Sequence, residues 1–173
     1  AGDPIPFATP GLASSGHMSG ELLQQMGDFP LQHVPYSGST QAFPDVLSGR
    51  VPLIFTTWTD IRPHYKAGTL KVLALLGVNT LEAAPGVAVA GDTVPGFSAR
   101  AFNGIAAPAA TPPEIIARIS EDIQTVVASD RFRETVLGLG SYPWSTTPEE
   151  TRDFLYDELH KWQEIAREAN IRI

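Results

Sequence analysis

Cysteine is absent from the 173-residue sequence, which excludes disulfide bonds, thiolate nucleophiles and zinc sites that use cysteine. The sequence also lacks any apolar run near the roughly 18 residues that a membrane-spanning helix requires. Its first residues, AGDPIPF, are neither basic nor long enough to form a signal peptide. We therefore expect a soluble chain from which any targeting segment has been removed.

Basic residues are scarce, because 12 Lys and Arg stand against 19 Asp and Glu, for a net charge of -7. No basic run with interleaved aromatic residues is present, so a phosphate backbone would be repelled and nucleic acid is not predicted as a partner. The four histidines lie apart, without the spacing of metal ligands, and we predict neither a metal nor a cofactor. A hydrophobic content of 43% suffices for one moderate core.

What the sequence does contain is a regular alternation of short apolar runs and helical patterns. The alternation favours a parallel sheet with right-handed crossovers, and hence a three-layer α/β domain. Residues 51–55 are apolar throughout, which is typical of a strand covered on both faces. The predicted strands are 5–8, 31–34, 51–55 and 70–76, and the predicted helices between them are 18–26, 41–47 and 60–67.

The second part of the sequence has a different pattern. Residues 79–95 resemble a connecting segment and residues 97–109 a long extended stretch. Three helices follow: one with Thr111 as cap and Pro112 at its first position, one at 130–139, and one at 148–169 with a capping box of Thr147 and Glu150. Their apolar faces need a partner, which is either the first domain or a sheet that is not in this chain.

Three turns of the predicted sheet carry the candidate binding residues, at 9–17, 36–40 and 56–60. In a parallel sheet such turns meet at the carboxyl edge, where helix N-termini present free N–H groups and a positive dipole end. Apart from Asp60 and the titratable His17, these turns offer neutral amides and hydroxyls, which suit a small carboxylate. The predicted ligand-binding residues are Thr9, Gly11, Ala13, Ser14, Ser15, His17, Tyr36, Ser37, Gly38, Thr56 and Thr57.

Each turn also has a plainer interpretation. Ser14 and Ser15 could only cap a helix, and His17 could be a structural histidine rather than a pocket residue. Residues 36–38 could form only a strand-to-helix turn, and Thr56 and Thr57 could be cap residues. These readings remain open beside the binding hypothesis at the level of the sequence.

Catalytic motifs are incomplete in this sequence. Residues 11–18 have the glycine spacing of a P-loop, but His17 replaces the phosphate-binding lysine and Met18 replaces the magnesium-binding hydroxyl. Ser14, Ser15 and His17 lack the G-x-S-x-G elbow and an orienting acid. An enzyme acting on a phosphate or acyl group is therefore the least favoured hypothesis.

Several ordered blocks resemble the substrate-binding proteins of tripartite tricarboxylate transporters, of the Bug or TctC type. The blocks are FATPGLASSGHMSGELLQQM, HVPYSGSTQA, DVLSGRV, PHYKAGTLKVLA and APAATP, followed by TTPEE and residues 162–171. Together they cover nearly the whole chain from Phe7. Their number and order make the resemblance far more specific than any single motif.

The resemblance implies a periplasmic, non-enzymatic protein with a type II periplasmic-binding-protein-like fold. Its two lobes would close around a small organic acid, typically a di- or tricarboxylate, and deliver it to the membrane subunits of a transporter. Recognition in that family rests largely on backbone amides of one loop from each lobe. By this comparison, residues 1–96 form the second lobe, and residues 97–173 supply a crossover strand and helices that would complete the first.

The sequence also departs from the family. Family members are substantially longer, so we expect a fragment, a truncated product or one chain of a pair. Pro52 and Thr56 stand where a VDLMFD pattern has acids, Ala13 replaces a small residue or glycine, and Pro10 removes an amide donor. The alternative function is a truncated lobe that binds no ligand and forms a homo-oligomer through the apolar faces after Phe97.

Overall fold

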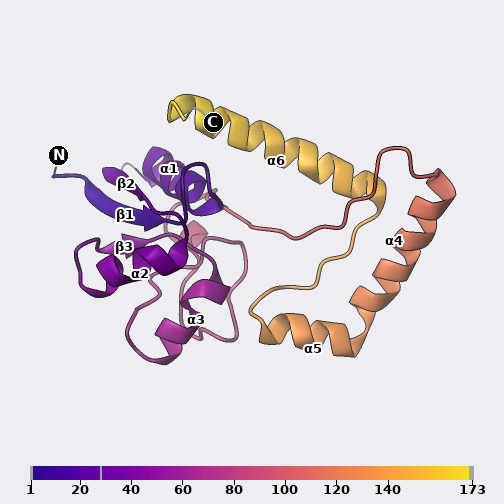
Figure 1. Cartoon of the computed structure of the whole chain (residues 1–173), viewed down its shortest axis with the longest axis horizontal. Helices are drawn as coiled ribbons and strands as arrows, with labels where there is room; N and C mark the ends of the chain where they lie inside the picture. Colours follow the sequence, from indigo (N-terminus) through magenta and orange to yellow (C-terminus); the bar gives the residue numbers. More distant parts are fainter. Residues whose placement is uncertain (1, 28, 172–173) are drawn as a thin grey trace. The chain divides into compact units, whose positions relative to one another are not determined.

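The computed structural model describes residues 2–27 and 29–171, which fall into two compact units. Unit 1 comprises Ala1–Ala101 with Trp162–Ile173, and unit 2 comprises Phe102–Lys161. Figure 1 traces the strands and the first three helices in unit 1, and the last helix, which runs from unit 2 into unit 1.

Unit 1 is built on a parallel three-stranded sheet in the order β2-β1-β3. Because β1 lies in the middle, its residues Phe7 and Ala8 are fully buried. The predicted alternation of strands and helices around a parallel sheet is confirmed. The strands are β1 (Ile5–Thr9), β2 (Leu31–Pro35) and β3 (Leu53–Ile54), and the helices are α1 (Ser15–Gly27), α2 (Ser39–Leu47) and α3 (Trp58–Lys66) (Figure 1).

Helices cover both faces of this sheet. Neighbouring residues of a strand point to opposite faces, so the side chains of Phe7 and Ala8 lie on opposite faces of the sheet. Phe7 lies against α1, where a Cβ added to Gly20 would come 2.5 Å from the Phe7 ring. Ala8 packs instead with Ala42 and Val46 of α2. The predicted three-layer arrangement is therefore present.

Two predicted strands differ in the structure. The strand expected at 51–55 is shortened to Leu53–Ile54, since Pro52 has no N–H to donate to a ladder. The strand expected at 70–76 does not form, because within the described residues the sheet ends at β3. Leu75 instead makes an isolated parallel bridge with Val89.

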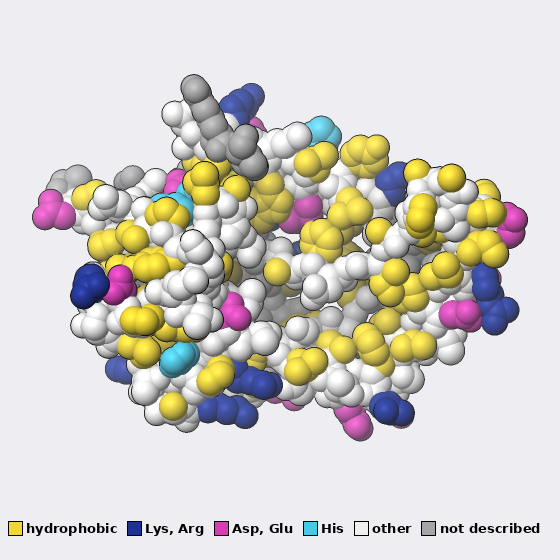
Figure 2. Space-filling view, viewed as in Figure 1, with side chains coloured by type: hydrophobic (Ala, Val, Ile, Leu, Met, Phe, Trp, Pro, Cys, Tyr) yellow, Lys and Arg dark blue, Asp and Glu magenta, His cyan; other side chains and the backbone are white. Residues whose placement is uncertain are grey.

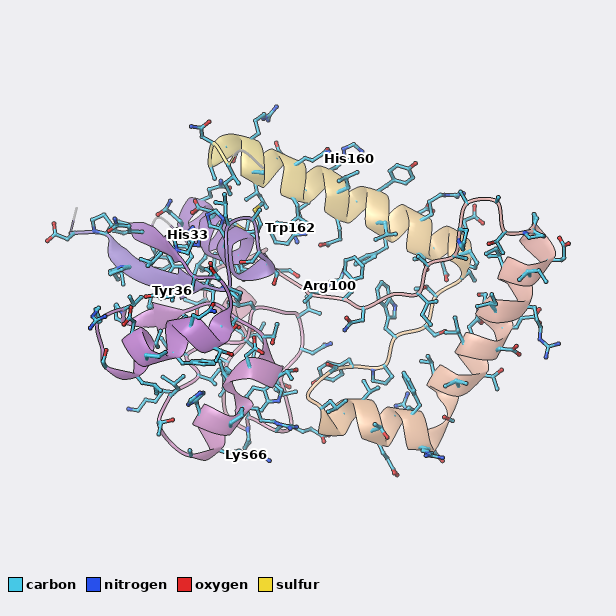
Figure 3. All side chains as sticks on the ribbon, viewed as in Figure 1. His33, Tyr36, Lys66, Arg100, His160 and Trp162 are labelled. Carbon is cyan, nitrogen blue, oxygen red and sulfur yellow. The ribbon has the colours of Figure 1, made fainter. Side chains whose placement is uncertain are left out.

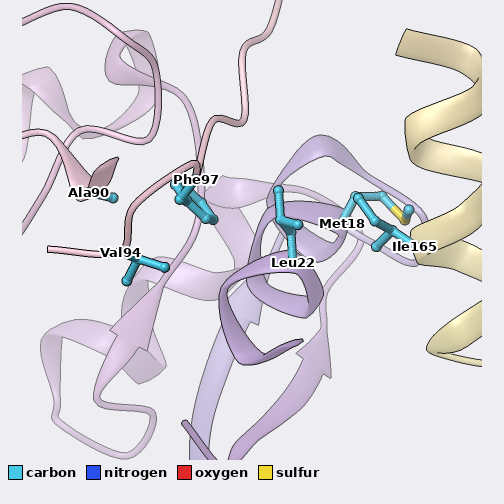
Figure 4. Close-up of a cluster of buried hydrophobic side chains, with 6 residues drawn as sticks. All are labelled: Met18, Leu22, Ala90, Val94, Phe97 and Ile165. Atoms are coloured by element: carbon cyan, nitrogen blue, oxygen red, sulfur yellow. The ribbon is translucent and has the colours of Figure 1, made fainter. Parts of the chain in front are cut away.

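A second core of unit 1 joins segments that are distant in the sequence (Figure 4). Ala90 comes from the 3-10 helix η1 (Ala90–Asp92) and Ile165 from the last helix, α6 (Pro148–Glu168). Ile165 therefore fixes the end of α6 to α1 within unit 1. The buried members are Met18, Leu22, Ala90, Val94, Phe97 and Ile165.

Unit 2 contains α4 (Pro113–Ala128), α5 (Asp130–Gly138) and the first part of α6, and neither α4 nor α5 has a buried residue. Its aromatic contacts centre on Phe154, whose ring lies edge-on to the rings of Phe102 and Trp144 at 5.1 and 4.8 Å. This contrasts with unit 1, where strands and helices enclose a core. The predicted apolar faces of α4 and α5 therefore contain no buried residue, whereas Ile165 of α6 is buried in unit 1.

The predicted helix ends in unit 2 are partly right. At α6 the Thr147 N–H donates to Glu150 Oε2 at 2.8 Å and the Glu150 N–H donates to Thr147 Oγ1 at 3.2 Å, so the capping box is confirmed. Helix α4 starts later than expected, because Pro112 has an extended ψ of 140° and itself precedes the helix in place of Thr111. The extended stretch expected at 97–109 forms no β-ladder in the described chain, since no strand lies beside it.

Residues 2–27 and 29–171 lack two features. No helix there combines the length and apolarity needed to cross a membrane. The same residues contain no group of three or more His, Asp or Glu side chains that could hold a metal ion.

Candidate functional site

All three predicted turns lie at one edge of the sheet. The parallel register aligns Thr9 with Pro35 and Ala8 with Ile54, so β1, β2 and β3 end together. Hydrogen bonds then join the turns in sequence. The Tyr36 N–H donates to the Thr9 carbonyl at 3.1 Å, and Ser39 Oγ lies 2.8 Å from Thr56 Oγ1. The structure therefore brings the predicted residues to a single edge.

The first turn is held by its own hydroxyl groups. The buried Thr9 Oγ1 accepts the Gly11 N–H at 3.3 Å and donates to the Gly11 carbonyl at 3.1 Å. Ser14 Oγ donates to the same carbonyl at 2.7 Å and accepts the His17 N–H at 3.3 Å. Ser14 is thus the cap of α1, as one of the two predicted alternatives stated. Its hydroxyl is occupied by this role.

His17 lies beneath this turn rather than on its surface. It is 4% exposed, and its Nδ1 accepts the Ala13 N–H at 3.0 Å. Its Nε2 lies 3.4 Å from Glu21 Oε1, one helical turn further along α1. Burial lowers the pKa of His17 and raises that of Glu21. Both ring nitrogens of His17 are therefore engaged within the protein.

His33, which the sequence interpretation did not include in the site, completes this cluster. Figure 3 shows His33 and Tyr36 in unit 1, and the ring of His33 stacks on that of His17 with centroids 3.6 Å apart. His33 Nε2 lies 2.6 Å from Thr9 Oγ1. Burial, and then the charge of His17, lower the pKa of His33 to about 4.

The signal that could have found His33 is the strand register. His33 pairs with Phe7 across the parallel ladder, and Phe7 shares a sheet face with Thr9 two residues on. A histidine two residues before the end of the neighbouring strand therefore points toward α1 and the first turn. Register is set by tertiary pairing, and the sequence alone left it open.

The second and third turns share a polar triangle of Ser39, Thr56 and Asp60. Both hydroxyl oxygens lie 2.8 Å from Asp60 Oδ2 and 2.8 Å from each other. The triangle ties the start of α2 to the start of α3. It also gives one oxygen of Asp60, the one acidic side chain in the three turns, two hydroxyl donors. The Thr56 hydroxyl is occupied by this structural role.

Tyr36 directs its hydroxyl away from this triangle. Tyr36 Oη donates to Asp45 Oδ2 at 2.7 Å, and this hydrogen bond raises the pKa of the tyrosine. Arg50 Nη1 donates to the other oxygen of Asp45 at 2.6 Å. The phenol is therefore anchored to α2, and the backbone around Ser37 and Gly38 remains as the part of this turn that can serve a ligand.

Backbone amides are the donors that remain at the edge. The first N–H groups of a helix have no acceptor within that helix, and α1, α2 and α3 all start here. Gly38 and Thr57 precede α2 and α3 without a side-chain cap bond. Gly38 has a φ of 132°, which favours glycine. The arrangement can hold an anion by neutral dipoles.

The spacing between α1 and β3 depends on Gly16. A Cβ at Gly16 would meet the carbonyl oxygen of Phe55 at 2.2 Å, so only glycine allows this approach. Phe55 directly precedes Thr56 and Thr57, and its N–H donates to the Ala8 carbonyl at 3.0 Å. Gly16 therefore sets how close the first and third turns lie.

Comparison with known proteins fits this geometry. The family described as "Tripartite tricarboxylate transporter family receptor" matches residues 3–171. The chain belongs to this family. The family is one of solute receptors rather than enzymes, so the resemblance in the sequence and the non-enzymatic assignment are confirmed.

Relatives and solved structures support the same assignment. Protein BugT of Bordetella pertussis is 29% identical over 170 residues, which cover 98% of this chain and 52% of BugT. The structure described as R. palustris Rpa4515 with adipate superposes with a TM-score of 0.84 at 25% identity, over 98% of this chain and 57% of that one. A TctC solute-binding protein from Polaromonas, at 17% identity and a TM-score of 0.80, shares the fold.

The length of the match differs between relatives. The chain spans about half the length of the first curated relatives it matches, with 51% of one and 52% of another covered. A protein from the clcB-clcD intergenic region of Pseudomonas knackmussii differs, since 93% of its length is covered at 23% identity. The ligand-contacting role of the residues in the three turns stays a prediction.

Proposed function

We propose that this chain forms one wall of a binding site for a small organic carboxylate. The observation that carries the proposal is the convergence of three helix N-termini at one sheet edge. The Tyr36 N–H, which donates to the Thr9 carbonyl, and the hydroxyls of Ser39 and Thr56, whose oxygens lie 2.8 Å apart, join them. None of the three turns contains a lysine or an arginine. Directional hydrogen bonds from amides would then select the carboxylate.

The proposed contacts follow from which groups are already occupied. The hydroxyls of Ser14, Thr56 and Tyr36 have partners in the protein, so the backbone amides near Ser15, Ser37 and Thr57 are the proposed donors. Thr9, Gly11, Ala13, Gly38 and His17 shape the turns that present these amides. A site of this kind binds without a charged side chain or a cofactor.

The proposed ligand class is that of dicarboxylates and related small acids. The neighbour Rpa4515 was solved with adipate, and family membership supports a receptor for organic acids. We further propose that the protein acts in the periplasm and delivers its ligand to the membrane subunits of a tripartite transporter. Residues 97–173 would contribute a crossover strand and helices to the first lobe of such a receptor.

The test measures the thermal stability of this chain against a panel of C4 to C6 dicarboxylates and citrate, followed by calorimetry. A ligand that binds only the folded protein raises its melting temperature. Replacement of Gly38 by valine should weaken this gain, since a φ of 132° strains any side chain. Gly77→Ala, whose Cβ would meet nothing within 4 Å, serves as the control. The absence of a shift across the whole panel would refute carboxylate binding by this chain.

A second candidate function is self-association through unit 2. Figure 2 shows hydrophobic side chains, in yellow, over the surface of α4. Val126 of α4 is 54% exposed and Ile105, before α4, is 77% exposed. Exposed apolar surface of this kind favours a protein partner, and a second copy of the chain is the proposed one. A chain that stays monomeric at high concentration would exclude it.

A further inference from the structure

We infer that His17 is a positioning residue of the proposed site, whose Nδ1 holds the first turn open to a ligand by accepting the Ala13 N–H. The inference rests on the proposed function because its consequence is a change in carboxylate affinity. The geometry behind it is that of the first turn alone. It assigns His17 an indirect role, because the side chain is buried and both ring nitrogens face the protein.

Ala13 is the residue that needs this support. Its φ is 57°, in the left-handed region, where a residue with a Cβ is disfavoured by about 1 kcal/mol or more. Such a conformation persists only where surrounding groups hold it. The Ala13 N–H has His17 Nδ1 as its acceptor at 3.0 Å. The imidazole therefore stabilises the turn at the point where the backbone reverses direction into α1.

The ring of His17 is itself fixed from three sides. Its Nδ1 accepts, so its hydrogen is on Nε2, which faces Glu21 Oε1 at 3.4 Å. The ring of His33 on β2 stacks on it with an interplanar angle of 13°. His33 is in turn bonded to Thr9 at the start of the turn. The stack thus connects Thr9 and Ala13 within the turn.

A proton on His17 would reverse this interaction. Nδ1 would then carry a hydrogen and face the Ala13 N–H, so that two donors meet at 3.0 Å. The titratable groups that face the ring are Glu21 on α1 and His33 on β2. Glu21 would favour the proton and His33, if charged, would oppose it. The turn should therefore lose its support in acid, and carboxylate affinity should fall with it.

The test compares His17→Ala, which removes the acceptor, with His17→Asn, whose Oδ1 lies near the position of Nδ1 and takes no proton. Adipate is the probe, measured by calorimetry. His17→Ala should bind about tenfold more weakly, which is the worth of one hydrogen bond, and His17→Asn should bind nearly as the wild type does. Between pH 7 and pH 5 the wild-type affinity should fall further than that of His17→Asn. The exposed His160→Asn is the matched control (Figure 3).

Two results would overturn the inference. One is a folded His17→Ala that binds adipate like the wild type. The other is a His17→Asn that is as stable as the wild type but as weak in binding as His17→Ala, or that loses affinity in acid as steeply as the wild type. A purely structural role of His17 would change stability in both variants and leave the pH profile of binding unchanged.

A ligand-free measurement separates this inference from the proposed function. Amide hydrogen exchange of Ala13, followed by NMR, should show protection in the wild type and in His17→Asn and loss of protection in His17→Ala. If the wild type binds no carboxylate, the proposed function fails, while this measurement still decides the role of His17. Equal protection of Ala13 in the wild type and His17→Ala would overturn the inference.

Discussion

The imidazole rings of His17 and His33 lie stacked, with centroids 3.6 Å apart and planes inclined by 13°. Two neutral rings can lie this close, whereas two imidazolium ions would repel each other. The pKa of each is lowered, that of His33 to about 4. The lowered pKa values favour a neutral pair at pH 7.

This pair predicts that stability falls as the pH is lowered. An unfolded histidine takes a proton near pH 6.5, whereas folded His33 takes one only near pH 4. Between these values the unfolded state binds more protons, so the free energy of unfolding should decrease by up to about 1.4 kcal/mol per pH unit for one proton. Glu21, whose pKa is raised by burial from 4.5, acts in the opposite sense at the acidic end.

Urea unfolding between pH 7 and pH 5 measures this slope. His33→Phe keeps a ring against His17 and removes the titrating group, so its slope should be smaller than that of the wild type even if its stability at pH 7 is lower. His160→Phe, at an exposed position of α6, should keep the wild-type slope. Equal slopes for the wild type and His33→Phe would contradict the prediction.

Gly16 provides a prediction about the distance between α1 and β3. The new Cβ of Gly16→Ala would lie 2.2 Å from the Phe55 carbonyl oxygen, so backbone must move. Ala favours a helix over Gly by up to about 1 kcal/mol, but overpacking of this kind costs about 1–3 kcal/mol. The expected result is a net loss of stability together with weaker carboxylate binding.

Chemical denaturation and calorimetry check this expectation. Gly77→Ala is the matched control in the same unit, because its Cβ meets nothing within 4 Å. It should change neither quantity by more than a few tenths of a kcal/mol. A Gly16→Ala protein with the stability and binding of the wild type would show that the first and third turns need no close approach.

Local patterns predicted much of unit 1 and the start of α6 in unit 2. The alternation of β1, β2 and their helices is predictable because each apolar run and each cap lies within a few neighbouring residues. Ser14 capping α1 and the Thr147–Glu150 box are contacts of this local kind. The family was recognisable from ordered blocks along the chain, and the comparisons confirm it.

Features set by distant pairing were harder to predict. Residues 70–76 have the composition of a strand, but a strand needs a neighbour, and the described sheet ends at β3. The stack of His17 on His33 and the bond from Ser39 to Asp60 join residues that only the tertiary fold brings together. The contacts with a ligand remain predictions, because they depend on the arrangement of the sheet edge when a ligand is bound.

The triangle of Ser39, Thr56 and Asp60 predicts that the Asp60 side chain contributes strongly to the stability of the protein. Asp60→Ala removes the acceptor shared by two hydroxyls at 2.8 Å, and each hydrogen bond to a charged group contributes about 1.5–3 kcal/mol. Since these residues are only partly buried, we expect a total loss near 2 kcal/mol. Asp60→Asn keeps one oxygen and should lose less.

Thermal and urea unfolding of these variants give the comparison. Asp122→Ala is the control, because its bond to Arg118 joins two largely exposed side chains and contributes at most about 1 kcal/mol. If Asp60→Ala were no more destabilised than Asp122→Ala, the triangle would have no part in holding the second and third turns together.

The apolar surface of unit 2 predicts association that depends on concentration. Ile119 of α4 is 40% exposed and Leu159 of α6 is 50% exposed, so lysine at either position should leave the fold intact. Each change adds a charge to a surface that would be desolvated in an oligomer, which opposes association.

Sedimentation velocity should show a wild-type chain that self-associates as its concentration rises, with Ile119→Lys and Leu159→Lys shifted toward the monomer. Gln124→Lys adds the same charge to α4 at an exposed polar residue and should behave as the wild type. Association that is equal in all four proteins would place the contact elsewhere on the chain, and the apolar faces would then need a different partner.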